Sequence, residues 1–226
     1  MSLPEHTAGL SVRKPVWGAV AALGVFVVFL LSATDIFPWA AGLDHDVHAW
    51  ILANRTPGWI SAAAVVTSTA SSTFTAPLVF LVAAALTPGV ISARLTRAVL
   101  VLLTMLLAVL LRFGISELLA RSRPAMVDWA VYAGGFSFPS GHTSDAALAA
   151  GLIAWLVVRR FDRAPRWLVW PLAASYALLI AWTRVYLGVH WPTDVLGSLA
   201  FVTAWLSGAL VFQRLDERVA TSSYLA

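Results

Sequence analysis

Cysteine is absent from this 226-residue chain, and lysine occurs once, at Lys14. Without cysteine the chain has no disulfide and no thiolate, so any metal would need histidine or carboxylate ligands. Charge is also scarce, because Asp, Glu, Lys and Arg make up 12% of the residues, whereas soluble domains carry about 25%. This composition excludes an ordinary soluble domain, and we expect a membrane partner and no nucleic acid.

Apolar residues are abundant instead, at 60% of the chain. A helix needs about 20 mainly apolar residues to cross a bilayer. The pattern predicts an all-α, polytopic membrane protein of six transmembrane helices, at 17–31 or 33, 57–86, 98–119, 141–158, 167–182 and 192–212. The second of these contains a polar interruption at 67–75, TSTASSTFT. A cleaved signal peptide is the alternative for the first helix, but no small-residue cleavage site precedes a soluble-looking segment, so we favour a retained span.

The segment 35–59 separates the first two spans and has a different character. Trp39, Trp50 and Trp59 alternate there with aspartates, which indicates an amphipathic, interfacial helix at the membrane surface. The stretch 44–48, DHDVH, contains residue types that bind metals. On an exposed interfacial helix we interpret these side chains as surface groups, and we predict no metal site and no cofactor.

Six spans place both termini on one side of the membrane, and the basic residues are distributed unequally between the two sides. Ten lie with the termini: Arg13, Lys14, Arg94, Arg97, Arg159, Arg160, Arg163, Arg166, Arg214 and Arg218. Four lie on the opposite face: Arg55, Arg121, Arg123 and Arg184. Positive residues gather on the cytoplasmic side, so we expect a multi-pass protein of the cytoplasmic membrane. Its predicted parts are a cytoplasmic tail (1–15), a six-span domain (16–213) and a second cytoplasmic tail (214–226).

A short polar stretch, 136–145 (FSFPSGHTSD), precedes the fourth span. Ser140 and Gly141 stand where a loop meets a helix, and the free N–H groups of a helix start bind anions. Arg123 and Arg184 fall on the same, extracytoplasmic face, and their guanidinium groups match the geometry of phosphate. The sequence therefore predicts a phosphate site on that face.

Two histidines add reactivity to this site. His190 and Asp194 are four residues apart, so in a helical turn the carboxylate can hold one ring nitrogen and leave the other as a nucleophile. His142 follows Gly141 and is placed to give a proton to a leaving oxygen. Attack by His190 on phosphorus would form a phosphohistidine, and water would then release phosphate without a metal.

These residues resemble the three-part signature of the type 2 phosphatidic acid phosphatase family, which shares its site with vanadium haloperoxidases. The resemblance covers about 112–204 and rests on Arg123-Pro124, on 139–142 (PSGH) and on the spacing of Arg184, His190 and Asp194. It implies a six-helix membrane phosphatase that acts on lipid phosphates or diphosphates through a phosphohistidine, without metal. By position it implies that His190 is the nucleophile, Asp194 the carboxylate that orients it and His142 the proton donor. It also implies a phosphate cradle formed by Arg123, Ser140, Gly141 and Arg184.

The sequence departs from the family signature at two positions. Ser116 stands where a lysine is usual, seven residues before Arg123, and Thr183 replaces a usual serine but keeps the hydroxyl. The missing lysine removes one cation from the cradle. Our hypothesis from spacing is that Arg112, one helical turn before Ser116, or Arg121 substitutes for it.

Together these observations predict a lipid phosphate or diphosphate phosphatase at the outer face of the cytoplasmic membrane. Undecaprenyl or other polyprenyl diphosphate, phosphatidic acid and phosphatidylglycerol phosphate all fit such a site. One alternative is a phosphotransferase, in which an alcohol accepts the phosphoryl group. A second is a non-catalytic lipid-phosphate carrier or flippase, which the loss of the lysine favours and the retained histidines oppose. The lipid used and the oligomeric state stay open at this stage.

Overall fold

The computed structural model describes residues 13–34, 37 and 39–223, with side chains for 16–34, 37 and 39–212. Within these ranges the chain forms helices and no strands, which confirms the predicted all-α class. The helices are α1 (Arg13–Ser32), α2 (Ala41–Asn54), α3 (Pro57–Ser68), α4 (Ser72–Leu86), α5 (Ile91–Leu119), the 3₁₀ turn η1 (Met126–Asp128), α6 (Gly141–Arg160), α7 (Arg166–Tyr186) and α8 (Pro192–Ser223). The predicted tails fall largely outside the described residues or side chains.

Four helices are long and apolar enough to cross a membrane: α5, α6, α7 and α8, the last as far as Phe212. The pair α3 and α4 makes a fifth span if counted together, and α1 is apolar over the shorter range Val16–Ser32. Several helices exceed their apolar stretches, since α5 begins at Ile91 rather than 98 and α8 continues beyond 212. Each added residue completes one more backbone hydrogen bond, so a formed helix extends into polar sequence at little cost.

The polar interruption predicted inside the second span is a break between α3 and α4, with a bend of 47°. Ser68 Oγ donates to the Val65 carbonyl at 2.7 Å, and Thr69 Oγ1 donates to the Val66 carbonyl at 2.8 Å. Hydroxyl groups that bond to nearby carbonyls compete with the helical ladder, which ends the first half of the span here.

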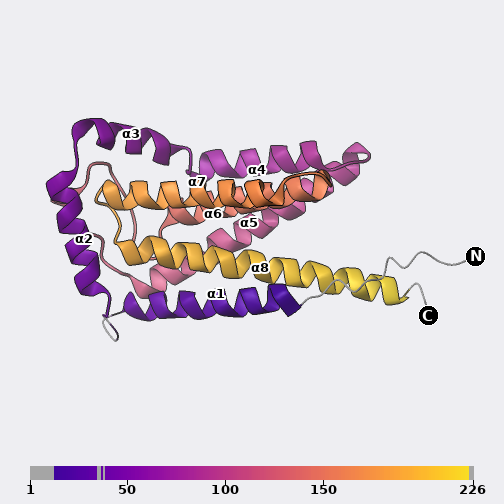
Figure 1. The fold of residues 1–226 in the computed structure, drawn as a ribbon, viewed down its shortest axis with the longest axis horizontal. Helices are drawn as coiled ribbons and strands as arrows, with labels where there is room; N and C mark the ends of the chain where they lie inside the picture. Colours follow the sequence, from indigo (N-terminus) through magenta and orange to yellow (C-terminus); the bar gives the residue numbers. More distant parts are fainter. Residues whose placement is uncertain (1–12, 35–36, 38, 224–226) are drawn as a thin grey trace, which may run out of the picture.

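Helix α6 occupies the middle of the bundle, between α7, α4 and α8 (Figure 1). Its buried residues are mostly small, including Ala146, Ala149, Gly151 and Ala154, which let neighbouring helices approach closely. At the end of the bundle away from the termini, α2 lies across the other helices (Figure 1). It turns Asp44, His48 and Ile51, one turn apart, toward the protein.

The first helix is part of the folded core. Helix α1 packs along α8, and the ring of Phe26 lies 5.5 Å from that of Phe201 and 6.1 Å from that of Phe138. That this helix is retained as a span rather than cleaved stays a prediction.

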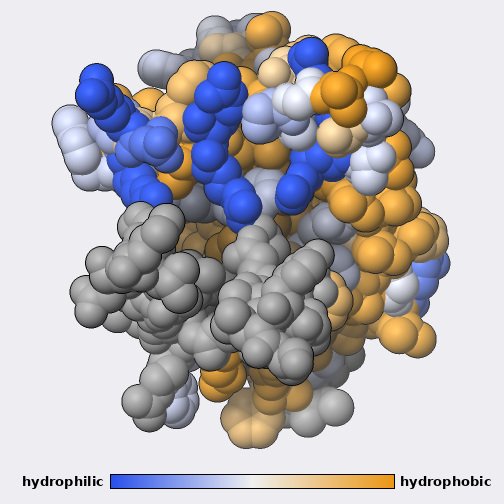
Figure 2. All heavy atoms as spheres, turned by 90° about the vertical axis from the view of Figure 1, so that its right-hand side faces the viewer, coloured by the Kyte–Doolittle hydropathy of each residue, from blue (hydrophilic) through white to orange (hydrophobic). Residues whose placement is uncertain are grey.

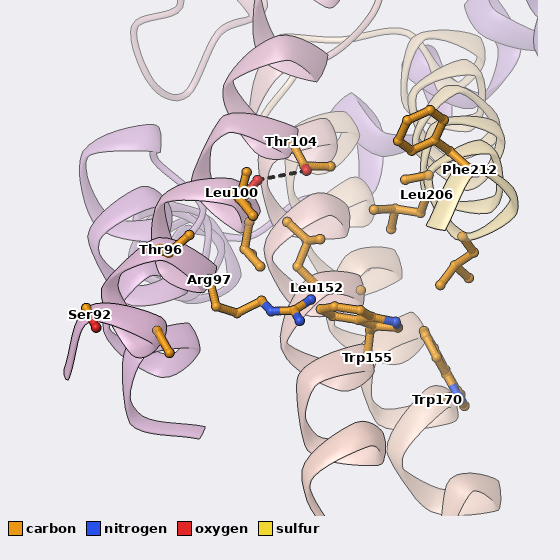
Figure 3. A pocket seen from close by; sticks show the side chains of 15 residues that line it. Ser92, Thr96, Arg97, Leu100, Thr104, Leu152, Trp155, Trp170, Leu206 and Phe212 are labelled. Atoms are coloured by element: carbon orange, nitrogen blue, oxygen red, sulfur yellow. Dashed lines mark hydrogen bonds between the residues drawn. The ribbon is translucent and has the colours of Figure 1, made fainter. Parts of the chain in front are cut away.

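The end of the bundle near the termini is basic. Arg159, Arg160, Arg163 and Arg166 are exposed there, and hydrophilic side chains stand among apolar ones (Figure 2). A groove of about 790 Å³ opens between α5, α6 and α8 at this end, and Arg97 points into it beside Trp155 (Figure 3). Most of its lining side chains are apolar, and among the described residues no histidine or carboxylate lines it. Histidines and carboxylates line a smaller cavity at the opposite end.

The close contact between α8 and the loop before α6 gives a prediction for stability. A Cβ atom at Gly197 would lie 2.7 Å from Cζ of the fully buried Phe138 and 3.3 Å from Cβ of Phe29. We expect Gly197→Ala to lower the free energy of unfolding by about 1–3 kcal/mol, the usual cost of overpacking. The measurement is the melting temperature in detergent, with Gly208→Ala as the control because that site has open space. Equal melting temperatures for the two variants would contradict this packing.

Candidate active site

Four helix ends meet at the end of the bundle covered by α2. Helices α5 and α7 end there, while α6 and α8 begin there, so segments far apart in the sequence share one cavity. The cavity measures about 530 Å³. Its titratable lining residues are Arg112, Glu117, Arg123, Tyr132, His142, Asp145, Arg184 and His190. The cavity therefore brings together the predicted Arg123, His142, Arg184 and His190, with Gly141 also in its wall.

The turn before α8 fixes the position of His190. Gly188 has a φ of +74°, and a Cβ there would lie 3.3 Å from the Asp128 carbonyl carbon, so only glycine fits without strain. Pro192 then begins α8, and Asp194, two residues later, accepts from the backbone N–H of Trp191 at 2.8 Å. A carboxylate that reaches back to the first N–H of its own helix caps that helix.

His190 lies between a carboxylate and a guanidinium group. Its Nδ1 is 3.3 Å from Asp194 Oδ2, and its Nε2 is 2.8 Å from Arg123 Nη1. Both His190 and Asp194 are buried. If Nδ1 carries the proton and donates to Asp194, Nε2 is left with a lone pair that accepts from Arg123, which also lines the cavity.

Asp194 accepts hydrogen bonds from four groups. Besides His190 and the Trp191 N–H, the hydroxyl of Ser137 and Nη1 of Arg121 both donate to its carboxylate. A buried carboxylate is costly unless its oxygens are paired, and here both oxygens are. Asp194 is therefore held in one orientation behind the histidine.

Burial sets the protonation state of His190. It lowers the pKa of His190 to about 3, and the positive charges of Arg123 and Arg184 add to the decrease while Asp194 opposes it. The ring is therefore neutral at neutral pH, which is the form that has a free electron pair for attack.

Backbone carbonyls hold Arg123 in place. Its Nε donates to Gly135 O at 2.9 Å, Nη2 to Gly134 O at 2.8 Å and Nη1 to Val189 O at 2.7 Å. Burial lowers the pKa of Arg123, and the charge of Arg112 acts in the same direction against that of Asp194. An arginine starts from a pKa above 12, so this group stays cationic.

Arg184 approaches the cavity from the last turn of α7. It is 3% exposed, and its Nη1 donates to Thr67 Oγ1 of α3 at 3.2 Å. Its Nε has no hydrogen-bond partner among the described residues. A buried N–H without a partner is costly, so the guanidinium group still has a hydrogen bond to offer an anion.

Ser140 is at the N-cap position of α6, but its hydroxyl makes no cap bond to the backbone. Instead it accepts from Thr143 Oγ1 at 3.1 Å and is fully buried. The residue at the helix start in the cavity wall is Gly141, and a Cβ there would lie 3.5 Å from Arg112 Nη1. The free helix terminus and a guanidinium group thus adjoin each other.

The two arginines proposed to replace the missing lysine lie in different places. Arg112 lines the cavity beside Ser116, and its buried Nε has no hydrogen-bond partner in the part of the chain that the structure describes. Arg121 instead donates to Asp194 and, through Nη2 at 2.8 Å, to Asp44 of α2. Only Arg112 is therefore placed among the cavity's lining residues.

The sequence did not identify three polar residues of this site. Asp145, one turn after His142, lines the cavity and accepts from Ser72 Oγ at 2.5 Å. Its helical spacing from His142 was a usable signal, whereas Ser72 belongs to the stretch 67–75, which the sequence marks only as a polar interruption of the second span. Asp44 was interpreted as a surface group, and it is 2% exposed.

Of the two histidines of α2, His48 differs from the predicted surface group, whereas His45 is exposed as predicted. His48 is buried and its Nε2 is 3.1 Å from Asp128 Oδ2, while His45 packs edge-on against the Trp191 ring at 4.8 Å. Within the described residues, no three His, Asp or Glu side chains are grouped so that they could hold a metal ion.

The part of the chain that contains most of the cavity residues is similar to known proteins. Residues 97–219 match the PAP2 superfamily. Phosphatidylglycerophosphatase B of Bacillus subtilis (strain 168) is 32% identical over 204 residues, which cover 87% of this chain and 95% of that protein. An undecaprenyl-diphosphatase of Sulfolobus acidocaldarius is 34% identical over 76 residues, covering 34% of this chain and 30% of that one.

Solved structures agree in fold. The crystal structure of the first transmembrane PAP2 type phosphatidylglycerolphosphate phosphatase from Bacillus subtilis superposes with a TM-score of 0.76 and 26% identity, covering 90% of this chain and 98% of that one. The structure of Aquifex aeolicus LpxE, at 21% identity and a TM-score of 0.56, covers 76% and 95% and shares the fold. Since the family match spans more than half of the chain and a relative is similar along nearly its whole length, the chain belongs to the PAP2 superfamily of membrane phosphatases.

Proposed function

We propose that this protein hydrolyses the phosphate or diphosphate of a lipid at the outer face of the cytoplasmic membrane, through a phosphohistidine at His190. The observation that carries the proposal is the placement of His190, with Nδ1 against Asp194 and Nε2 against Arg123, in a cavity that also holds His142. A binding protein needs the cations of the cavity but has no use for an oriented, neutral histidine.

In the first step, Nε2 of His190 forms a bond to phosphorus while the bond from phosphorus to the leaving oxygen breaks. Arg123 Nη1 now donates toward Nε2 at 2.8 Å, so it must transfer this hydrogen bond to a phosphate oxygen as the substrate enters. His142 gives its proton to the leaving oxygen. The ring becomes cationic when it is phosphorylated, and the Asp194 carboxylate stabilises that charge.

In the second step, water attacks the phosphohistidine, His142 takes a proton from it, and the bond between nitrogen and phosphorus breaks. The oxygens of the transferred group face Arg112, Arg123, Arg184 and the N-terminus of α6. Fixed donors of this kind stabilise the charge that spreads over the equatorial oxygens. We propose that these cations do the work that a metal ion does in other phosphatases.

A lipid substrate is supported by the cavity and by the relatives. Phe113 and Phe136 line the cavity with the arginines, so it offers apolar contacts beside a charged centre. The relatives are named as a phosphatidylglycerophosphatase and undecaprenyl-diphosphatases. An amphiphilic phosphate or diphosphate from this group is the proposed substrate.

The first prediction of this function concerns phosphate release by the purified protein in detergent, with EDTA present. We expect release from polyprenyl diphosphate, phosphatidic acid or phosphatidylglycerol phosphate, and a loss of at least about 1,000-fold in His190→Ala, because the nucleophile is gone. Vanadate, which mimics pentacoordinate phosphorus, should inhibit the wild type.

Other results of this assay separate the alternatives. Binding of these lipids without release would replace the phosphatase with a lipid-phosphate carrier. Release only when an alcohol is added would indicate a phosphotransferase. Activity that EDTA abolishes would contradict the metal-independent mechanism.

A second prediction tests Arg112 as the substitute for the missing lysine. We expect Arg112→Ala to lower kcat/KM by roughly 10- to 100-fold, because hydrogen bonds to charged groups contribute about 1.5–3 kcal/mol. Adding Ser116→Lys to this variant should restore part of the activity, since Ser116 lines the same cavity. The control is Arg163→Ala on an exposed loop. An active Arg112→Ala enzyme would show that the cradle works without this cation.

A third prediction tests the sidedness. The proposal of six spans with cytoplasmic termini places η1 outside the cell and the loop between α6 and α7 inside. Because the chain has no cysteine, Val127→Cys and Asp162→Cys each introduce a single thiol, and both positions are exposed. A membrane-impermeant maleimide added to intact cells should label the first and not the second. The reverse labelling would place the cavity on the cytoplasmic side.

A further inference from the structure

We propose that Asp44 and Arg121 are positioning residues of the reaction centre, and that α2 is thereby part of the catalytic unit rather than only a surface anchor. This inference rests on the proposed function, since it concerns how Asp194 serves His190. It assigns a role to two residues that do not line the cavity.

Arg121 bridges two carboxylates on different helices. Its Nη1 donates to Asp194 Oδ1 and, at 2.8 Å, to Thr193 Oγ1, both at the start of α8. Its Nη2 donates to Asp44 Oδ2 of α2 at 2.8 Å. The Arg121 side chain is 14% exposed and that of Asp44 2%, so solvent does little to weaken these ion pairs.

Asp44 also holds the first turn of α8 directly. Its Oδ1 accepts from the Thr193 backbone N–H at 3.0 Å, and its Oδ2 accepts from Thr193 Oγ1 at 2.6 Å. A carboxylate at a helix N-terminus satisfies a free N–H and interacts favourably with the helix dipole. Asp44 thus caps, from a different helix, the very turn that carries Asp194.

The charges of this cluster suit the reaction. Asp44 and Asp194 contribute two negative charges and Arg121 one positive charge, so the cluster has a net charge of −1. This net charge of −1 balances the single positive charge that His190 acquires on phosphorylation. The positive charge of Arg121 keeps Asp194 ionised while His190 is neutral. Because Arg121 is also paired with Asp44, its charge is shared between two carboxylates. Asp194 therefore keeps part of its negative charge for the cation that forms on His190.

The test measures the rate constant of phosphoenzyme formation in a single turnover, with radiolabelled phosphatidic acid or the better substrate found above. The rate constant does not depend on the fraction of folded enzyme, whereas the amplitude does. We expect Arg121→Met and Asp44→Asn each to lower the rate constant by roughly 10- to 100-fold, the range for residues that orient reacting groups through one intermediary. Arg121→Lys, which keeps the charge, should recover part of it.

A double variant tests whether Asp44 acts through Arg121. We expect Asp44→Asn to lower the rate constant much less in the Arg121→Met background than in the wild type, because residues of one network are not additive. The controls are Asp46→Asn, an exposed aspartate of the same helix, and Arg163→Met, and neither should change the rate constant.

Three outcomes would overturn the inference. The rate constants of Arg121→Met and Asp44→Asn could stay within twofold of the wild type, or only the amplitude could fall, which would make both residues structural. The third is a fall of the rate constant in the Asp46→Asn control equal to that in Asp44→Asn. If Arg121→Met does not fold, Arg121→Lys and Asp44→Asn decide by the same measurement. A failure of the proposed function itself is recognised with His190→Ala: if that variant still forms product, His190 is not the nucleophile.

Discussion

The structure depends on one buried carboxylate, that of Asp194. It is fully buried, and its two oxygens accept from a histidine, an arginine, a serine and a backbone N–H. A charge in such a place is tolerated only when every lone pair has a partner, so the segments that supply these donors must all be in position at once. The loop before α6, the end of α5 and the turn before α8 are fixed by this requirement.

The cavity is rich in arginine although the chain carries little charge. Three guanidinium groups line it, those of Arg112, Arg123 and Arg184. The carboxylate of Asp145 interacts electrostatically with Arg112. Arg123 is held by three carbonyls, whereas Nε of Arg112 and Nε of Arg184 have no hydrogen-bond partner within the described ranges. Positive charge that is fixed and incompletely satisfied is suited to bind a multiply charged anion.

The sequence was sufficient to predict the helical class, the place of the polar interruption in the second span and the meeting of Arg123, His142, Arg184 and His190, because apolar runs and motif spacing are local signals. That the interruption divides the span into two helices appears only in the structure. It was not sufficient for the residues that support the site from a distance. Asp44 lies 150 positions before Asp194, and nothing in a run of aspartates and tryptophans indicates which carboxylate is buried. Likewise Arg112 and Arg121 were equivalent by spacing, and only the packing of α5 against α6 and of α2 against α8 distinguishes them.

The break between α3 and α4 has a consequence for how substrate reaches the cavity and how products leave it. The polar residues 71–73 at this break line the cavity together with Phe113 and Glu117 of α5. In the proposed function, a lipid headgroup enters between these helices while its hydrocarbon chains remain in the leaflet, so lipid and enzyme meet by diffusion in two dimensions. The two products then leave in different phases, since the shortened lipid diffuses away within the membrane and inorganic phosphate passes into water.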